Sequence, residues 1–287
     1  MRHTKPRNCR RLYRNRNRII CAYPFTEGGG LVARNLGYTG RELDAKIEGA
    51  PLWSVGPDGL EMLFDGVNDR LRCSSPEIGV QQGRELDIYL NDGGGTGGSV
   101  YRHNIGFSCR MRFRTTDSTA LTRMIGKVGN GSGFIVNFNF PTAGKLTFYV
   151  QSFAGAENLE SSGTPALNDG RLHEMWLVHD RRVPGITNHR YNIYLDGRLD
   201  ATRLGVADGP LVDGFDFMVG AHDFGFWIGR MSLCEVWNCI ISPREVASYW
   251  ADGWQDYRAP LRKAWKAGAA PVGGFGDVYS QALLRPT

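Results

Sequence analysis

The sequence has no apolar run long enough to cross a bilayer as a helix, because its longest hydrophobic stretches are only a few residues. The opening segment Met1–Lys5 is not followed by an apolar stretch, so we expect no secretory signal and no membrane partner. Cysteine is scarce, six residues in 287, and no Cys-x-x-Cys pair or Cys/His cluster with metal-ligand spacing is present. We therefore expect reduced thiols rather than disulfides, and no zinc site.

Acidic residues are missing from the first 18 positions, which contain seven arginines and one lysine. Residues 255–287 carry a further net charge of +3, so the formal +5 of the whole chain leaves −6 for residues 19–254. Because the ends of the chain are basic and the body is acidic, we expect an acidic partner to bind at the ends. We predict a basic N-terminal arm at 1–18, a folded body at 19–254 and an extended basic tail at 255–287.

Glycine is abundant, with 38 residues and no fixed period, which indicates many tight turns between strands. Alternation is clearest at Phe107–Arg114, where apolar residues face one way and Ser or Arg the other, as in a half-buried antiparallel strand. The spacing of turn signals predicts about ten to fourteen short strands. Similar alternation recurs at Phe134–Phe140, Leu146–Val150, His173–His179 and Tyr191–Leu195, the last followed by the turn-forming pair Asp196-Gly197.

One helix is predicted near the end of the body. Ser242-Pro243-Arg244-Glu245 has an N-cap serine, a proline at the first helical position and a glutamate three residues after the cap, which is a capping box. Gly253 marks the end of this helix. The fold class predicted is therefore all-β: a two-sheet antiparallel β-sandwich or jelly roll with one short C-terminal helix and extended basic termini.

Four parts of the chain, in this order, resemble LamG-like domains of the concanavalin A-like lectin/glucanase superfamily: Ala22–Gly30, Leu63–Asp69, Leu167–His173, and Phe226–Ser232 with Ile240–Val246. They look like the opening strand and Gly-rich turn, the Phe-Asp-Gly-x-Asx-Asp segment, the Asp-Gly-x-x-His turn, and the closing strands and helix. The resemblance covers roughly residues 18–253 and implies two curved sheets packed face to face. The superfamily includes lectins, pentraxins, laminin G modules, glycosidases and virion proteins, so the fold does not fix the function.

Catalysis is disfavoured by one position. Glycosidases of this superfamily carry Glu-x-Asp-x-Glu on a strand, which brings the nucleophile and the acid/base together. Here the segment Glu85–Tyr89 has Glu85 and Asp87, but Tyr89 stands where the third acid would be. We therefore expect no enzymatic activity. His173 is interpreted as a structural residue.

Two binding sites remain open from the sequence. The first is a calcium site, in which Asp and Asn oxygens on rim loops would hold the ion as a cofactor. These residue types also form turns, so no metal ligand is assigned. A glycan would stack on Trp227 beside His222 and Asp223, although Trp227 is also compatible with a core-facing strand. The candidate calcium-binding residues are Asp65, Asn68, Asp69, Asn91 and Asp92.

The charged arm and the aromatic tail are the strongest functional features. The candidate partner-anchoring residues are Arg10, Arg11, Arg14, Arg16 and Arg18 in the arm, and Trp254, Tyr257 and Trp265 in or next to the tail. The leading hypothesis is a non-enzymatic, homo-oligomeric structural protein that decorates or attaches to a virion such as a bacteriophage capsid. It would be found in the virion or, before assembly, in the cytoplasm. The alternatives are a carbohydrate-binding module for surface glycans, nucleic-acid binding through the arm, and a glycoside hydrolase.

Overall fold

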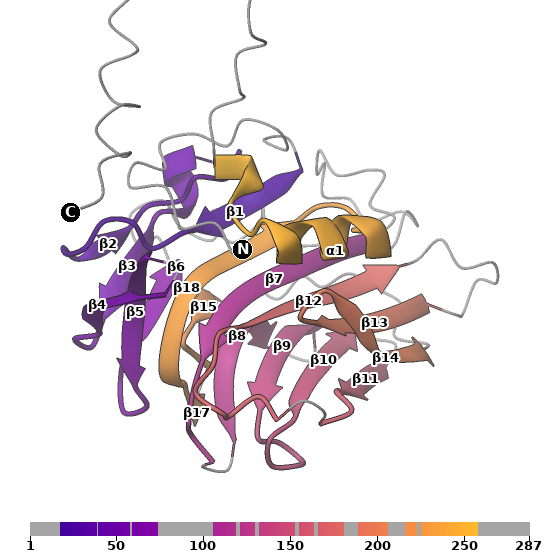
Figure 1. Ribbon diagram of the computed structural model, residues 1–287. Helices are drawn as coiled ribbons and strands as arrows, with labels where there is room; N and C mark the ends of the chain where they lie inside the picture. The colour runs from indigo at the N-terminus through magenta and orange to yellow at the C-terminus, as the bar shows by residue number, and fades with distance from the viewer. Residues whose placement is uncertain are drawn as a thin grey trace, which may run out of the picture.

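The computed structural model describes residues 18–38, 40–57, 59–73, 106–118, 121–129, 132–152, 155–163, 166–180, 189–205, 216–222 and 225–257. These residues form two antiparallel sheets packed face to face, and helix α1 (Pro243–Ala251) lies across the outer face of one of them (Figure 1). The predicted two-sheet sandwich with one short helix is confirmed.

Each sheet has eight strands. The first contains, in spatial order, β14 (Arg198–Gly205), β13 (His189–Leu195), β12 (His173–Asp180), β7 (Gly106–Arg114), β18 (Ile228–Trp237), β5 (Gly59–Asp65) and β4 (Leu52–Gly56), and β1 (Ile19–Tyr23) also pairs with β18. The second contains β11 (Gly155–Glu160), β10 (Leu146–Ser152), β9 (Ser132–Phe138), β8 (Thr122–Gly129), β15 (Phe217–Val219), β6 (Arg70–Cys73), β3 (Ala45–Glu48) and β2 (Val32–Ala33). A small hairpin, β16 (Ala221–His222) with β17 (Gly225–Phe226), and 3₁₀ turns at Gly40–Leu43 and Gln255–Tyr257 complete the described elements.

The main core lies between the two sheets and is built by the alternation that the sequence shows. Phe107 on β7 packs against Phe134 on β9 and Phe148 on β10, with ring centroids 5.2 and 6.0 Å apart. The predicted tight turn after β13 is also present. Asp196 and Gly197 have φ of 50° and 84°, the positive values that a two-residue hairpin turn requires.

The outer face of β7 is buried, contrary to the prediction from the sequence. Its arginines were predicted to face solvent, but Arg110 and Arg112 are 0% and 1% exposed. A second, smaller hydrophobic core covers this face of the first sheet, and it includes Trp176, Trp237 and Tyr249. The prediction was wrong because alternation of polar and apolar residues does not distinguish a solvated face from a buried polar layer.

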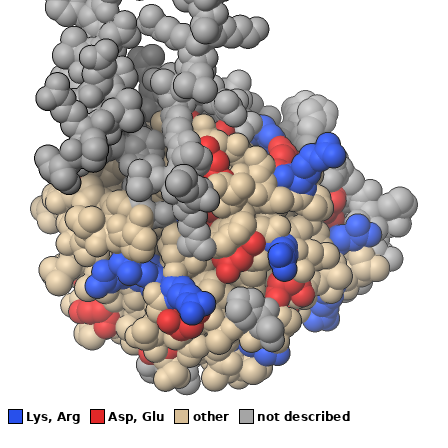
Figure 2. All heavy atoms as spheres, in the orientation of Figure 1, with Lys and Arg blue, Asp and Glu red and all other residues tan. Residues whose placement is uncertain are grey.

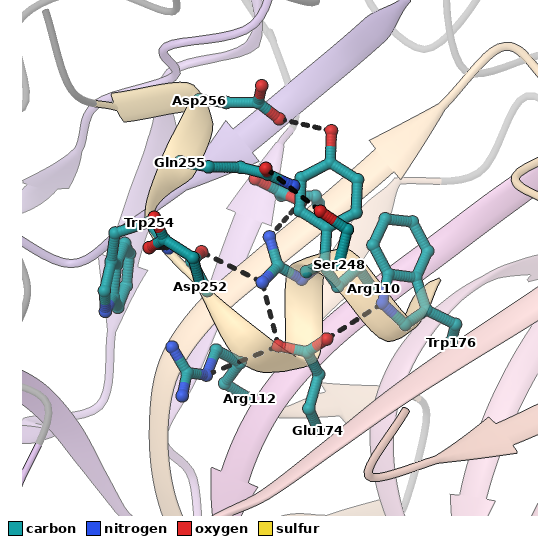
Figure 3. A network of polar contacts seen from close by, with 12 residues as sticks. Arg110, Arg112, Glu174, Trp176, Ser248, Asp252, Trp254, Gln255 and Asp256 are labelled. Atoms are coloured by element: carbon teal, nitrogen blue, oxygen red, sulfur yellow. Dashed lines mark hydrogen bonds and ion pairs between the residues drawn. The ribbon is translucent and has the colours of Figure 1, made fainter. Parts of the chain in front are cut away.

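A buried ion-pair network occupies this layer (Figure 3). The Arg110 guanidinium donates to the Glu174 carboxylate at 2.8 Å and to the Gly253 carbonyl at 2.9 Å, and it lies 3.4 Å from Glu235. The Tyr257 hydroxyl donates to the other oxygen of Glu235. The network therefore joins the two central strands β7 and β12 to β18 and to the segment that follows α1.

Aromatic side chains pack around the network and bind its charged groups. The indole N–H groups of Trp176 and Trp237 donate to Glu174 and Glu235 at 3.0 and 3.1 Å. Arg112 lies 3.5 Å from Glu174, and its guanidinium stands over the Trp254 ring. Burial would lower the pKa of Arg110, but the attraction of Glu174 and Glu235 raises it above its ordinary value, so this arginine stays charged.

Helix α1 is held in place by its cap and by this layer. The predicted capping box is present: Ser242 accepts from the Glu245 backbone N–H, and the Glu245 side chain accepts from that of Ser242. The helix ends at Ala251 with Asp252 as C-cap, so Gly253 lies just beyond it. A Cβ on Gly253 would lie 1.9 Å from the Arg112 guanidinium, which shows that glycine is needed there for close approach.

We expect Glu174→Ala to lower the free energy of unfolding by about 3–5 kcal/mol, because it leaves Arg110 buried without its nearest carboxylate. Urea denaturation followed by tryptophan fluorescence measures this change. The control is Arg34→Ala, which removes an ion pair whose arginine side chain is 53% exposed and is expected to cost less than about 1 kcal/mol. Equal effects of the two substitutions would contradict a stabilising role for the network.

Candidate functional site

The turn that contains Asp169 and His173 is structural, as the sequence predicts. The His173 ring nitrogens lie 2.9 Å from the Asp196 carboxylate and 3.0 Å from that of Asp169, so both are occupied. Burial lowers the pKa of His173, but the hydrogen bonds and charges of the two aspartates outweigh it, and the net pKa is raised.

The first group of calcium candidates also forms turns. Asp65 accepts backbone N–H groups from Val67 at 2.8 Å and Asn68 at 3.4 Å. Asp69 is 2% exposed and accepts from the backbone N–H groups of Ala50 at 2.7 Å and Asp65 at 3.0 Å. The turn interpretation of these residues is confirmed. Asn91 and Asp92 lie outside the described residues.

The described part of the chain has neither a metal-binding cluster nor a membrane-spanning helix. It contains no group of three or more His, Cys, Asp or Glu residues placed to hold a metal ion. None of its helices is long and apolar enough to cross a membrane. The segment Glu85–Tyr89, which bears on catalysis, lies outside the described residues.

The predicted glycan platform at Trp227 needs correction. Trp227 is fully buried and packs edge-on against Phe113 and Phe138, with centroids 5.7 Å away in each case. Its ring belongs to the main core and offers no surface to a sugar. His222 contributes backbone to β16 while its side chain, like all of Asp223, lies outside the described residues.

The described anchoring candidates contact the body itself. Arg18 donates to Glu245 at 2.9 Å and to the Cys239 sulfur at 3.1 Å. Trp254 and Tyr257 are 0% and 2% exposed, so their predicted role as exposed docking residues is corrected: they cover the buried arginines. The compact structure thus extends past the predicted boundary at 254 to Tyr257. The candidates outside the described residues are Arg10, Arg11, Arg14, Arg16 and Trp265.

A surface groove emerges as the best candidate binding site. It has a volume of about 530 Å³ and lies on the outer face of the first sheet, between the edge of that sheet and the start of α1. Its lining residues come from β13, β14 and the first turn of α1: Arg190, Asn192, Tyr194, Leu199, Thr202, Arg203, Leu204 and Pro243. Elsewhere, basic and acidic side chains are interspersed on the face shown in Figure 2.

The polar groups of the groove are arranged to donate hydrogen bonds. The Thr202 hydroxyl donates to the Asn192 side-chain oxygen at 2.8 Å, so what Asn192 has to offer a ligand is its amide N–H groups. Burial raises the pKa of Tyr194, so its hydroxyl stays protonated at neutral pH. Arg190 is exposed, and it stands opposite Asp180 in the pairing of β13 with β12.

Apolar surface and a neutralised arginine complete the groove. Leu199 and Leu204 are each 55% exposed. Arg203 is tied down by Glu157 at 2.9 Å and by the Asn158 carbonyl at 2.7 Å, so its charge is already compensated. Arg190, whose side chain is exposed, is the second cation of the groove.

Sequence reasoning missed this groove, although a signal was present. Arg190, Asn192 and Tyr194 alternate with the core residues Tyr191, Ile193 and Leu195 along β13. The alternation shows an outward polar face. It does not show that α1, which contacts β14, leaves a groove open along the outer face of β13 and β14.

Comparisons with known proteins agree with the fold. The laminin G family model described as the concanavalin A-like lectin/glucanases superfamily matches residues 92–247. No curated protein matches the sequence. Among solved structures, the binding domain of Paraclostridial Mosquitocidal Protein 1 superposes with a TM-score of 0.59 at 7% identity, covering 82% of this chain and 52% of that one.

Two further structures are similar. The binding domain of Botulinum Neurotoxin DC, in complex with SialylT, has a TM-score of 0.56 at 10% identity, covering 82% of this chain and 51% of that one. Domain 4 of AbnA, an extracellular GH43 arabinanase from Geobacillus stearothermophilus in complex with arabinotriose, has a TM-score of 0.53 at 11% identity, covering 82% and 98%. This chain thus spans about half the length of the toxin binding domains, and at these identities the likeness shows the fold.

The raised pKa of His173 predicts a pH-dependent contribution to stability. A histidine whose folded pKa exceeds its unfolded value stabilises the fold below the unfolded value and loses this effect as pH rises through the folded pKa. We expect the melting-temperature difference between wild type and His173→Gln to be larger at about pH 5.5 than at about pH 8.5. The control Arg171→Gln should show no such change, and a difference that is constant with pH would contradict the prediction.

Proposed function

We propose that this chain, which belongs to the concanavalin A-like lectin/glucanases superfamily, is a non-catalytic saccharide-binding module whose ligand lies in the groove between β14 and α1. The observation that carries the proposal is the set of donors in this groove. The Asn192 amide, the Tyr194 hydroxyl and the exposed Arg190 guanidinium line one wall together, next to the apolar surface of two leucines.

This chemistry suits a sugar. Hydroxyl and ring oxygens of a saccharide accept hydrogen bonds from amide, phenol and guanidinium groups, while the C–H faces of the ring pack on apolar side chains. The described residues that line the groove include no carboxylate, so the proposal assigns binding to the groove and no bond cleavage.

The comparisons support this proposal at the level of the fold. The arabinanase domain, of which 98% is covered, was solved with arabinotriose, and the toxin domains are named as binding domains. A module of this architecture that holds a saccharide without cleaving it is therefore consistent with the neighbouring structures.

Attachment to a virion stays a prediction. It depends on the basic arm at 1–18 and on the tail, and the arginines up to Arg16 together with Trp265 lie outside the described residues. Capsid and nucleic-acid partners therefore rest on the charge distribution of the sequence alone. A saccharide-binding body is compatible with either partner at the ends of the chain.

The test is an array of neutral and acidic oligosaccharides that includes arabinotriose, followed by titration calorimetry with the best probe. Asn192→Ala and Arg190→Ala are expected to weaken binding about tenfold or more, as loss of a buried or charge-assisted hydrogen bond does. Melting temperature confirms that each variant is folded.

Two variants serve as controls. Arg171→Ala removes a side chain that is 85% exposed and does not line the groove, and Trp227→Phe alters the core. Both should bind as the wild type does. Binding that survives both groove substitutions but is lost in Trp227→Phe would contradict the groove, and no binding to any probe would contradict the proposed function.

A further inference from the structure

Two buried histidines share a hydrogen bond where β13 begins. His179 on β12 is 0% exposed, and His189 at the start of β13 is 3% exposed. The Nε2 atom of His179 lies 2.9 Å from the Nδ1 atom of His189, so one ring donates and the other accepts. This histidine pair therefore ties the end of β12 to the first residue of β13, and neither ring lines the groove.

Aromatic rings pack on the histidine pair from β13, β7 and β10. The His179 ring stacks on the Tyr191 ring, with centroids 4.6 Å apart and 17° between the planes, and its centroid lies 5.6 Å from that of Phe107. Phe148 packs on both Tyr191 and Phe107. A phenol titrates near pH ~10, so Tyr191 stays neutral in the acid range. An imidazolium among these rings has lost its water, which disfavours the charged form.

Glu157 on β11 is an acidic group on the core side of the histidine pair. Gly205 stands opposite His189 in the pairing of β14 with β13. A Cβ on Gly205 would lie 2.6 Å from the Tyr191 ring and 2.8 Å from the Glu157 side chain, so both pack against this glycine. The Glu157 carboxylate favours a proton on the pair, but it is shared with Arg203, which lies 2.9 Å away.

Two further charged residues lie on the other face of the sheet. Asp180 follows His179 on β12, and Arg190 follows His189 on β13. The two charged residues stand opposite each other in the pairing of these strands. Because successive side chains of a strand point to opposite faces, Asp180 and Arg190 face away from the imidazoles and act on them only across the sheet.

The shared hydrogen bond limits how many protons the folded histidine pair takes up. One added proton leaves the bond in place, since the N–H of the imidazolium donates to the bare nitrogen of the other ring. A second would put an N–H on both facing nitrogens and break the bond. In the unfolded chain both histidines take up a proton near pH ~6.5, so below this value the open form binds at least one proton more. Acidification thus favours opening by about tenfold for each pH unit.

We propose that the histidine pair is an acid-sensitive latch, which holds the start of β13 on β12 at neutral pH and opens at about pH 5, so that the groove releases its saccharide. Arg190 and Asn192 of the groove alternate along β13 with His189 and Tyr191 of the core. The segment that the latch holds therefore also carries contacts to the ligand. The release rests on the proposed function, whereas the opening of the strand does not.

Hydrogen exchange of the full chain tests the opening. Protection of the amides at residues 189–192 is expected to fall at least about tenfold in wild type between about pH 7.5 and about pH 5, because a difference of one proton predicts about 30-fold. In the double variant His179→Gln/His189→Gln, which has no imidazole at either position, protection should fall less than about threefold. Wild type and variant are compared at the same pH, so that their intrinsic exchange rates cancel.

The matched control is His173→Gln, which removes another buried histidine but keeps the latch, so β13 should still open in acid. If the double variant does not fold, nuclear magnetic resonance of the wild-type imidazoles decides. Only one ring of the histidine pair is expected to titrate above about pH 5. Titration of both rings above this pH with β13 still protected would overturn the proposal, as would an equal loss of protection in wild type and double variant.

Titration calorimetry with a neutral saccharide from the array tests the release, because such a probe has no group that titrates in this range. Its affinity for wild type is expected to weaken at least about threefold between about pH 7.5 and about pH 5, and to stay within about twofold in the double variant, since only the closed form binds. Opening of β13 with an unchanged affinity contradicts the latch as a control on the groove. Lack of binding by any probe at neutral pH contradicts the proposed function, while hydrogen exchange still decides whether the strand opens.

Discussion

Two arginine side chains buried beneath α1 determine how the outer face of the first sheet is organised. A guanidinium without solvent needs carboxylates and carbonyls around it, because an unpaired charge in the interior is far too costly. Glu174, Glu235 and the Gly253 carbonyl supply these groups for Arg110. Because one partner comes from beyond α1, the helix and the turn after it can occupy only one position over the sheet.

The candidate groove is a consequence of that position. α1 and the turn at 255–257 cover the outer face at β7, β12 and β18, where the polar layer is buried. α1 also contacts β14, and Tyr194 on β13 belongs to the buried cluster, but the helix does not cover Arg190, which stays exposed while Arg110, two strands away, does not. The same residue type thus stabilises the fold in one strand and lines a binding surface in another.

The sequence predicts the sandwich well, because the information is local. Period-two alternation at Phe107–Arg114, the Asp196-Gly197 turn and the capping box at Ser242 each specify a structure within a few residues. Burial of the Arg110 face could not be predicted, since the carboxylates that pair with it lie 64 and 125 residues away in sequence.

Two of the site predictions failed for a related reason. Trp227 was assigned to ligand contact because it is a large aromatic beside polar residues, and Trp254 to partner contact because it begins an aromatic tail. However, a tryptophan contributes as readily to a core, and whether it is buried depends on which distant strands pack on it. The groove was missed because it is an area of the first sheet that α1 leaves open. Where α1 lies on the sheet depends on tertiary contacts, which the local sequence pattern does not show.

The pairing of β1 with β18 and the contact of Tyr257 with Glu235 link the first and last described parts of the chain. During synthesis on the ribosome, the carboxylate of Glu235 on the central strand β18 is therefore covered only after residues up to 257 have been made. Until that point the nascent chain exposes charged groups and indole rings that the finished protein hides. Completion of this sheet is thus a late event of translation, and premature termination just before residue 254 would release a chain whose central layer lacks Trp254 and Tyr257.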